Sequence, residues 1–337
     1  MRSSSLCSGL LVALLIALAP CVRAQDASID ELLKKLPSPE ELAKPAVDKA
    51  LQQPDPALKD PLAREVLLAL QAQNFARAAD LSHQLLVRYP QAAGALCMNA
   101  TTAAAVGQIG EASFSLRKAI TLRPDLAVAY FMLGNLEIRQ QHYDAALPHL
   151  KKAAELEPKN PIALVFLSQC YAKLGHGNEG IDYAKRATVA APGFVEGWFQ
   201  LARVEKAVGH NDETLSALKH AAEIAPDNVP LLVMVGSACI QQNRTDEAIP
   251  LLQHAAEISP NEAVLQSQLG LAYQKQGKHA DAAKAFERAT QLAPTNRQNW
   301  ERLAEEYRAL GQTADANRAA ARAQSLPATA ASAKRKN

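Results

Sequence analysis

The amino-acid sequence predicts an all-α solenoid built from one repeated helical unit. Prolines recur every 34 residues, and the seven of them are Pro90, Pro124, Pro158, Pro192, Pro226, Pro260 and Pro294. An alanine stands five residues before each of the last six prolines. The composition is 48% hydrophobic but only 5% aromatic, which suits closely packed helices better than sheets. A fixed period of this length indicates a supersecondary unit stacked many times around one continuous core.

The charge balance argues against one broad class of function. The chain has 337 residues and a formal net charge of +2, with 21% of its residues charged. A dedicated nucleic-acid binder normally carries a strong basic excess. We therefore expect no nucleic acid among the partners of this protein.

Residues 1–24 have the features of a secretory signal peptide. Arg2 supplies a positive start, an uncharged apolar run follows at 10–19, and Ala24 is a small residue at a cleavage site. We predict cleavage before Gln25 and an extracytoplasmic location, either periplasmic or secreted.

Two other interpretations of this first segment remain open. An uncleaved anchor would need about 20 apolar residues to span a bilayer comfortably, and the run is shorter. A lipoprotein modified at Cys21 is the second, although Pro20 directly before the cysteine is wrong for that signal.

Residues 25–58 are richer in proline and charge than the rest of the chain. The pairs Ser28/Glu31 and Ser38/Glu41 each fit a capping box, which predicts two short helices. The proline content favours a tether that holds the array away from a surface. The alternative is a segment that packs on the first repeat or on a partner.

The unit 263–296 illustrates the repeat. Its first helix is predicted to end at Gly277 and its second before Pro294, because proline cannot continue a helix. Gly270 is small, so the second helix can approach closely, and Phe286 is expected to fill the gap between neighbouring units. The pattern is carried by Gln266, Leu269, Gly270, Tyr273, Gly277, Ala282, Phe286, Ala289 and Pro294.

This pattern resembles the tetratricopeptide repeat, whose signature places Trp, Leu, Gly, Tyr, Ala, Phe, Ala and Pro at these spacings. The resemblance implies a right-handed superhelix in which the first helix of each pair lines an inner groove. We expect an array of eight repeats over 59–330, followed by a basic tail at 331–337. The units are 59–92, 93–126, 127–160, 161–194, 195–228, 229–262, 263–296 and 297–330.

The two ends of the array depart from the pattern. The first unit is degenerate, with Val66 at the glycine position and Leu85 at the second alanine. Terminal units are often atypical because one face meets water. The final helix, predicted over 313–325, carries polar residues among alanines and can close the stack. We expect a solvated C-terminal end, with contact to anionic lipid as the alternative.

The cysteines and histidines are predicted to be structural. Cys97, Cys170 and Cys239 follow the signal segment, and an odd number cannot pair fully within the chain, so we expect buried thiols. Histidines recur at the repeat period in two rows, His142, His176, His210 and His220, His254. Neighbours in a row should be about 10 Å apart, too far to share one metal ion.

Catalysis is not expected either. The sequence has no glycine-rich phosphate loop, no nucleophile elbow and no HExxH motif. No segment outside the repeats is large enough for an enzyme domain. We predict no catalytic residues, no metal and no cofactor.

The predicted binding site is the inner groove of the middle repeats. An apolar stripe there is flanked by amides and cations, which would suit an extended peptide with an acidic group. The predicted site residues are Phe131, Asn135, Arg139, Val165, Gln169, Lys173, Phe199, Arg203 and Lys206. The alternative is that these residues only pack within and between helices.

The clamp that similar repeats use to hold chaperone C-termini is not predicted. That clamp places a lysine four residues before an asparagine, where this sequence has Phe131 before Asn135. Gln200 stands where a later clamp arginine would lie. A partner of another kind is therefore expected.

The sequence favours a non-catalytic extracytoplasmic scaffold that binds a protein or peptide, by analogy in envelope assembly or export. The alternative is a membrane-associated accessory subunit that binds glycan or an exported polymer. A glycan binder would more often show stacked tryptophans along the groove, whereas Trp198 and Trp300 stand at core positions of the repeat.

Overall fold

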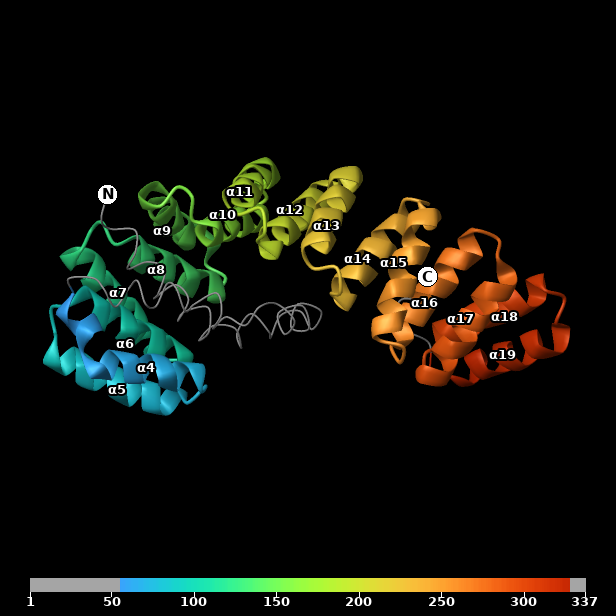
Figure 1. Ribbon diagram of the computed structural model, residues 1–337, viewed down its shortest axis with the longest axis horizontal. Coiled ribbons are helices and arrows are strands. Elements are labelled where there is room, and N and C mark those ends of the chain that lie inside the picture. Colours follow the sequence, from blue (N-terminus) through green and yellow to red (C-terminus); the bar gives the residue numbers. More distant parts are fainter. Residues whose placement is uncertain (1–54, 328–337) are drawn as a thin grey trace. The chain divides into compact units, whose positions relative to one another are not determined.

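The computed structural model describes residues 55–327, and all regular structure in that range is helical (Figure 1). The predicted signal peptide, the predicted tether up to residue 54 and the predicted basic tail lie outside the described residues. The chain divides into two compact units, and the boundary lies directly after His210. The first contains η1 Pro56–Lys59, α4 Pro61–Gln71, α5 Phe75–Arg88, α6 Ala93–Ala105, α7 Ile109–Leu122, α8 Ala127–Arg139, α9 Tyr143–Leu156, α10 Pro161–Lys173, α11 Gly177–Ala190 and α12 Val195–Val208.

The second unit begins at Asn211 and repeats the same alternation of helices. Its helices are α13 Asn211–Ile224, α14 Val229–Gln241, α15 Thr245–Ile258, α16 Ala263–Lys275, α17 His279–Leu292, α18 Arg297–Ala309 and α19 Thr313–Ser325. Within each unit, helices that follow one another in sequence pack side by side. First helices of successive repeats also pack directly, α10 on α12 and α14 on α16. This stacking confirms the predicted all-α repeat fold.

The glycine of the repeat allows its two helices to approach closely. A Cβ atom added at Gly270 of α16 would lie 2.7 Å from the ring of Phe286 in α17. Gly134 and Gly236 are in similar close contact with Leu150 and Leu252. Phe286 also clusters with Leu303 and Ala304 of the next repeat. The phenylalanine therefore fills space within its own repeat as well as between repeats.

The periodic proline accepts a hydrogen bond from the following helix where that helix carries tryptophan. The indole N–H of Trp300 donates to the carbonyl of Pro294 at 3.0 Å. Trp198 makes the same bond to Pro192 at 2.9 Å. Each tryptophan is half-buried, so the bond fixes the entry of the chain into the next repeat.

The array begins with two aspartates that cap its first turns. Asp55 accepts hydrogen bonds from the backbone N–H groups of Ala57 at 3.0 Å and Gly94 at 2.8 Å. Asp60 caps α4 through the N–H of Leu62 at 2.9 Å. Ala57 and Leu58 are only 0% and 2% exposed. Ala57 and Leu58 therefore belong to the packed core, although the sequence suggested that residues 55–58 end a tether.

Polar contacts join successive repeats at residues twenty apart. In each pair, a residue of a second helix meets a residue in the next repeat's first helix. Three are polar bonds or ion pairs, and the fourth places a lysine over an aromatic ring. The pairs are Lys151–Tyr171, Lys185–Glu205, Gln253–Tyr273 and Glu287–Tyr307.

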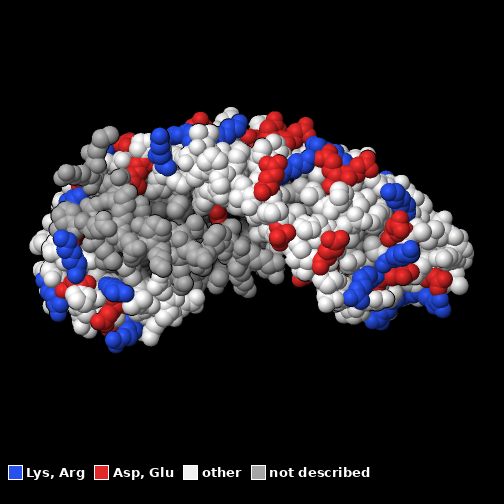
Figure 2. Space-filling view, viewed as in Figure 1, with Lys and Arg blue, Asp and Glu red and all other residues white. Residues whose placement is uncertain are grey.

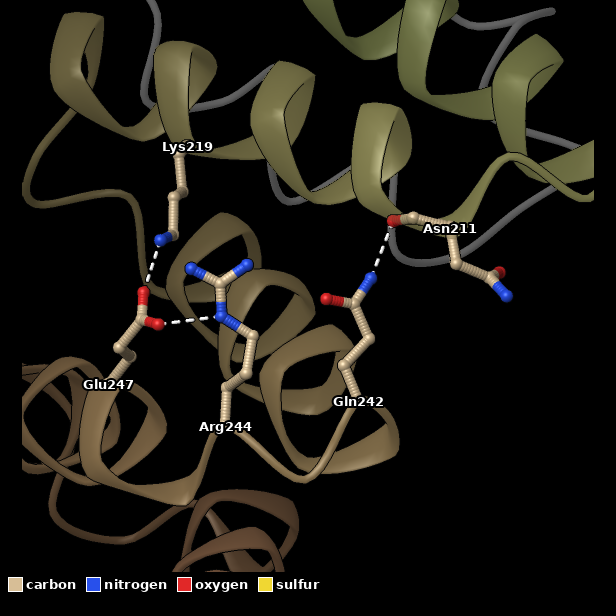
Figure 3. A network of polar contacts seen from close by, with 5 residues as sticks. All are labelled: Asn211, Lys219, Gln242, Arg244 and Glu247. Carbon is tan, nitrogen blue, oxygen red and sulfur yellow. Dashed lines mark hydrogen bonds and ion pairs between the residues drawn. The ribbon is translucent and has the colours of Figure 1, made fainter.

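Lys219 has a different kind of partner, because the residue twenty positions after it is a cysteine. Lys219 of α13 precedes Cys239 by twenty residues and instead forms an ion pair with Glu247 of α15 (Figure 3). Arg244 bonds the same carboxylate at 2.6 Å. Lys219 first and then Arg244 hold the pKa of Glu247 below its usual range. Gln242 adds a 2.5 Å bond to the carbonyl of Asn211.

The surface of the second unit carries both signs of charge. Figure 2 shows acidic and basic side chains interspersed over its visible face. Between residues 55 and 327, no helix combines the length and apolar character needed to cross a membrane.

Candidate functional site

Three first helices of the first unit carry the predicted binding residues. Phe131, Asn135 and Arg139 lie on α8; Val165, Gln169 and Lys173 lie on α10; and Phe199, Arg203 and Lys206 lie on α12. Steps of three or four residues place the members of each set on one helix face. Because α10 packs against both α8 and α12, the three sets are neighbours.

The α8 part of this surface is buried. Phe131 is 1% exposed, and its ring meets Phe166 of α10 edge-on at 5.2 Å between ring centroids. Asn135 is 6% exposed. The expectation that Phe131 offers an exposed ring to a ligand is therefore wrong, since the ring joins α8 to α10. Arg139 is half-buried in the last turn of α8.

The α10 and α12 part of the surface is open. Val165, Gln169 and Phe199 are half-buried, and the three cations Lys173, Arg203 and Lys206 are exposed. Within residues 55–327, none of these cations forms a hydrogen bond or an ion pair. Apolar side chains therefore lie beside cations that remain available to a ligand.

Two of the three cations also have a local role. Lys173 and Lys206 stand in the last turns of their helices, where positive charge is favoured by the helix dipole. Arg203 lies about one turn before the end of α12, where that effect is weaker. The helix dipole therefore does not account for the positive charge of Arg203. Of the three cations, Arg203 gives the best support for a binding surface.

A buried hydrogen bond positions α12 against α10. Gln200 is 4% exposed, and its amide N–H donates to the hydroxyl of Ser168 at 3.1 Å. The bond lies between Phe199 and Arg203 in sequence and holds their helix in place. Sequence reasoning treated Gln200 only as a departure from the chaperone clamp and missed this contact.

The two ends of the α12 surface differ in charge. Glu196 is half-buried in the first turn of α12, and burial raises the pKa of its carboxyl group. Arg203 and Lys206 stand toward the other end of the helix. A ligand with an acidic group would therefore place that group near the C-terminal end of α12.

The cysteines and histidines have structural environments. All three described cysteines are buried, as predicted, and burial raises the pKa of the Cys97 and Cys170 thiols to about 12. His210 contacts the buried carboxylate of Glu205 at 2.7 Å. In residues 55–327, no three side chains of the metal-binding kinds come together as a metal site.

Comparison with known proteins gives two matches to family models. Residues 137–203 and 231–295 each match a model of the tetratricopeptide repeat. These segments contain parts of the repeats described above, including α10 and most of α12 in the first unit. No curated protein sequence matches the chain.

Several solved structures are similar to part of this chain at low identity. The crystal structure of YrrB, a TPR protein with an unusual peptide-binding site, is 20% identical with a TM-score of 0.49, over 56% of this chain and 96% of YrrB. The MamA protein is 21% identical with a TM-score of 0.46, over 51% of this chain and 94% of MamA. MamA of Desulfovibrio magneticus RS-1 is 17% identical with a TM-score of 0.45, over 49% of this chain and 94% of that MamA chain. The two segments matched by the family models are tetratricopeptide repeats.

Proposed function

We propose that this protein is a non-catalytic scaffold that binds an extended acidic segment of a partner protein on the inner surface of α10 and α12. The observation that carries this proposal is the placement of Lys173, Arg203 and Lys206, exposed and without a partner in residues 55–327, beside half-buried apolar side chains. Exposed cations next to an apolar surface suit a ligand that carries both acidic groups and apolar side chains.

Each part of the surface matches one feature of an extended peptide. Apolar side chains of the peptide can rest on Val165 and Phe199. The amide of Gln169 can bond the peptide backbone. A carboxylate can form two parallel hydrogen bonds with the guanidinium of Arg203, which gives direction as well as energy.

The cellular setting is a separate part of the proposal. The predicted signal peptide supports an extracytoplasmic scaffold, and envelope assembly or export is a setting in which such scaffolds are useful. The partner would then be another envelope protein that exposes an acidic segment.

The glycan or polymer alternative has weaker support. A glycan-binding groove usually offers aromatic faces for sugar rings. Both tryptophans of this chain are half-buried, and their indole N–H groups bond Pro192 and Pro294. The two indole rings therefore stabilise the turns between repeats. The peptide proposal has the better support for this reason.

The test is selection from a random peptide library displayed on phage, with the purified protein as bait. We expect enriched peptides to combine aspartate or glutamate with apolar residues. Arg203→Glu should weaken binding of a selected peptide by at least about tenfold, which is about 1.4 kcal/mol. Lys284→Glu makes the same charge change at an exposed residue of α17 and should leave binding intact. Equal binding by both variants would refute the proposed site.

A further inference from the structure

Glu196 places an acidic side chain at the N-terminal end of the open surface of α12. Glu196, Phe199 and Arg203 follow the spacing i, i+3, i+7, which puts the three side chains on one face of the helix. Phe199 and Arg203 already belong to the proposed binding site. The site therefore carries a negative charge at one end of α12 and a positive charge toward the other, with an aromatic ring between them.

The acidic residue is specific to this repeat. Residues separated by multiples of 34 occupy the same place in each repeat. In the two repeats before Glu196 and the two after it, the equivalent residues are Val128, Ile162, Pro230 and Val264. The first turns of α8, α10, α14 and α16 contain no acidic residue. The helix dipole favours negative charge at the start of all these helices, so it does not explain why α12 differs from its neighbours.

The carboxylate of Glu196 lacks a partner of opposite charge. Between residues 55 and 327 it forms no ion pair, and its charge is stabilised by its own backbone N–H. The side chain is half-buried, and burial raises the pKa of its carboxyl group. A carboxylate that is partly removed from water without a cation is unfavourable. A cationic group supplied by a ligand would relieve this cost.

The separation of the two charges sets a spacing in the ligand. The seven residues from Glu196 to Arg203 rise about 10 Å along the helix, at about 1.5 Å per residue. An extended peptide that follows α12 advances about 3.3 Å per residue, so three residues cover the same length. A peptide with an acidic residue at Arg203 therefore brings the residue three positions away to Glu196. A side chain between the two can rest on Phe199.

We propose that Glu196 makes the site selective for segments in which a lysine or arginine stands three residues from an acidic residue. The carboxylate of Glu196 pairs with the basic side chain, and the guanidinium of Arg203 pairs with the acidic one. A segment with acidic residues at both places would bring like charges together at Glu196 and is rejected. The inference rests on the proposed function and adds a requirement for a basic residue at a fixed spacing.

The test is a second phage selection, from a library with an aspartate fixed at the centre and every other position random. The baits are the unmodified chain, Glu196→Gln and Glu213→Gln. Glu213 is an exposed glutamate in the first turn of α13, so its replacement makes the same charge change outside the site. We expect the unmodified chain and Glu213→Gln to enrich lysine and arginine three residues before or three residues after the aspartate. Glu196→Gln should lose this enrichment.

The affinity of one enriched peptide then shows whether the two charges meet. The peptide is acetylated, so that its terminal amine cannot act as the cation. Replacing its basic residue by glutamine should weaken binding to the unmodified chain about tenfold, because a charge-assisted hydrogen bond is lost. The same replacement should change binding to Glu196→Gln by less than about twofold, because the partner is already absent. Glu196→Lys should reverse the preference and bind the peptide better when glutamate replaces the basic residue.

Two results would overturn the inference while the proposed function stands. In the first, the unmodified chain selects peptides without a basic residue at either position. In the second, Glu196→Gln enriches the basic residue as strongly as the unmodified chain does. Arg203→Glu tests the proposed function separately, because it removes the partner of the fixed aspartate and should abolish the selection. If Arg203→Glu selects the same peptides as the unmodified chain, or if the unmodified chain selects none, the proposed function and this inference both fail.

Discussion

The hydroxyl of Tyr307 donates a 2.7 Å hydrogen bond to the carboxylate of Glu287 in the preceding repeat. Gln253 bonds the hydroxyl of Tyr273 at 2.9 Å across the same kind of boundary, also twenty residues apart. These contacts connect α17 to α18 and α15 to α16. They show that the tyrosine of the repeat does more than fill space, since its polar end holds one unit to the next.

Replacing Tyr307 by phenylalanine should weaken this boundary. We expect Tyr307→Phe to lower the free energy of unfolding by about 1–2 kcal/mol, because a hydrogen bond to a charged group is lost. Urea unfolding followed by circular dichroism measures the change. Tyr130→Phe removes a hydroxyl from a half-buried tyrosine that makes no such bond to any residue between 55 and 327, and it should cost less than about 0.5 kcal/mol. Equal costs for the two variants would contradict the role of the bond.

The same tyrosine should make the second unit sensitive to alkali. Burial first, and then the hydrogen bond to Glu287, raises the pKa of Tyr307 to about 12. An unfolded tyrosine has a pKa of about 10. The stabilisation is therefore fully present below about pH 10 and is lost as the pH rises through about 12. Tyrosinate absorbance should show one late-titrating residue that is missing in Tyr307→Phe.

Gly270 should not tolerate even one methyl group. The added Cβ of Gly270→Ala would meet the Phe286 ring at 2.7 Å, and overpacking of this kind costs about 1–3 kcal/mol. Gly110 lies in α7 with nothing within 4 Å of an added Cβ. Gly110→Ala should instead stabilise by about 0.5–1 kcal/mol, because alanine favours helix. Thermal unfolding of both variants should give shifts of opposite sign.

Asp60 should contribute to loss of stability in acid. The N–H of Leu62, followed by Arg88 and Tyr89, holds the pKa of Asp60 below its usual range. Its stabilisation is present above the unfolded pKa of about 3.9 and is lost as the pH falls through the lower folded pKa. Asp60→Asn keeps an acceptor for the Leu62 N–H but loses the charge. Its unfolding free energy should fall less steeply below pH 4 than that of the unmodified chain.

Phe131 and Phe199 should respond differently to truncation. Phe131 is 1% exposed and packs on Phe166, so Phe131→Ala should cost about 3–5 kcal/mol of stability. Phe199 is half-buried on the open surface, so Phe199→Ala should cost less and weaken peptide binding instead. Unfolding and binding measurements on each single variant separate the effects. A large stability loss in Phe199→Ala would remove it from the proposed site.

The sequence by itself determined the repeat and its local geometry. The helix predicted over 313–325 is α19 Thr313–Ser325, and Gly277 follows α16 with a φ of 72°. The close approach at Gly270 was also foreseen. These features depend on residues near one another in the chain, where helix periodicity, proline and glycine act directly.

The tertiary structure alone decided which groove residues are open. Phe131 and Phe199 occupy the same place in their repeats, so spacing gives them the same expected role. Phe131 is buried against an aromatic ring from another helix, whereas Phe199 is not. The contact between Glu287 and Tyr307 likewise needs two repeats to stack before their side chains meet. The burial of a side chain and its hydrogen-bond partners depend on residues that folding brings together from different helices. The repeat spacing gives the position of a residue within its own helix, but it does not give these contacts.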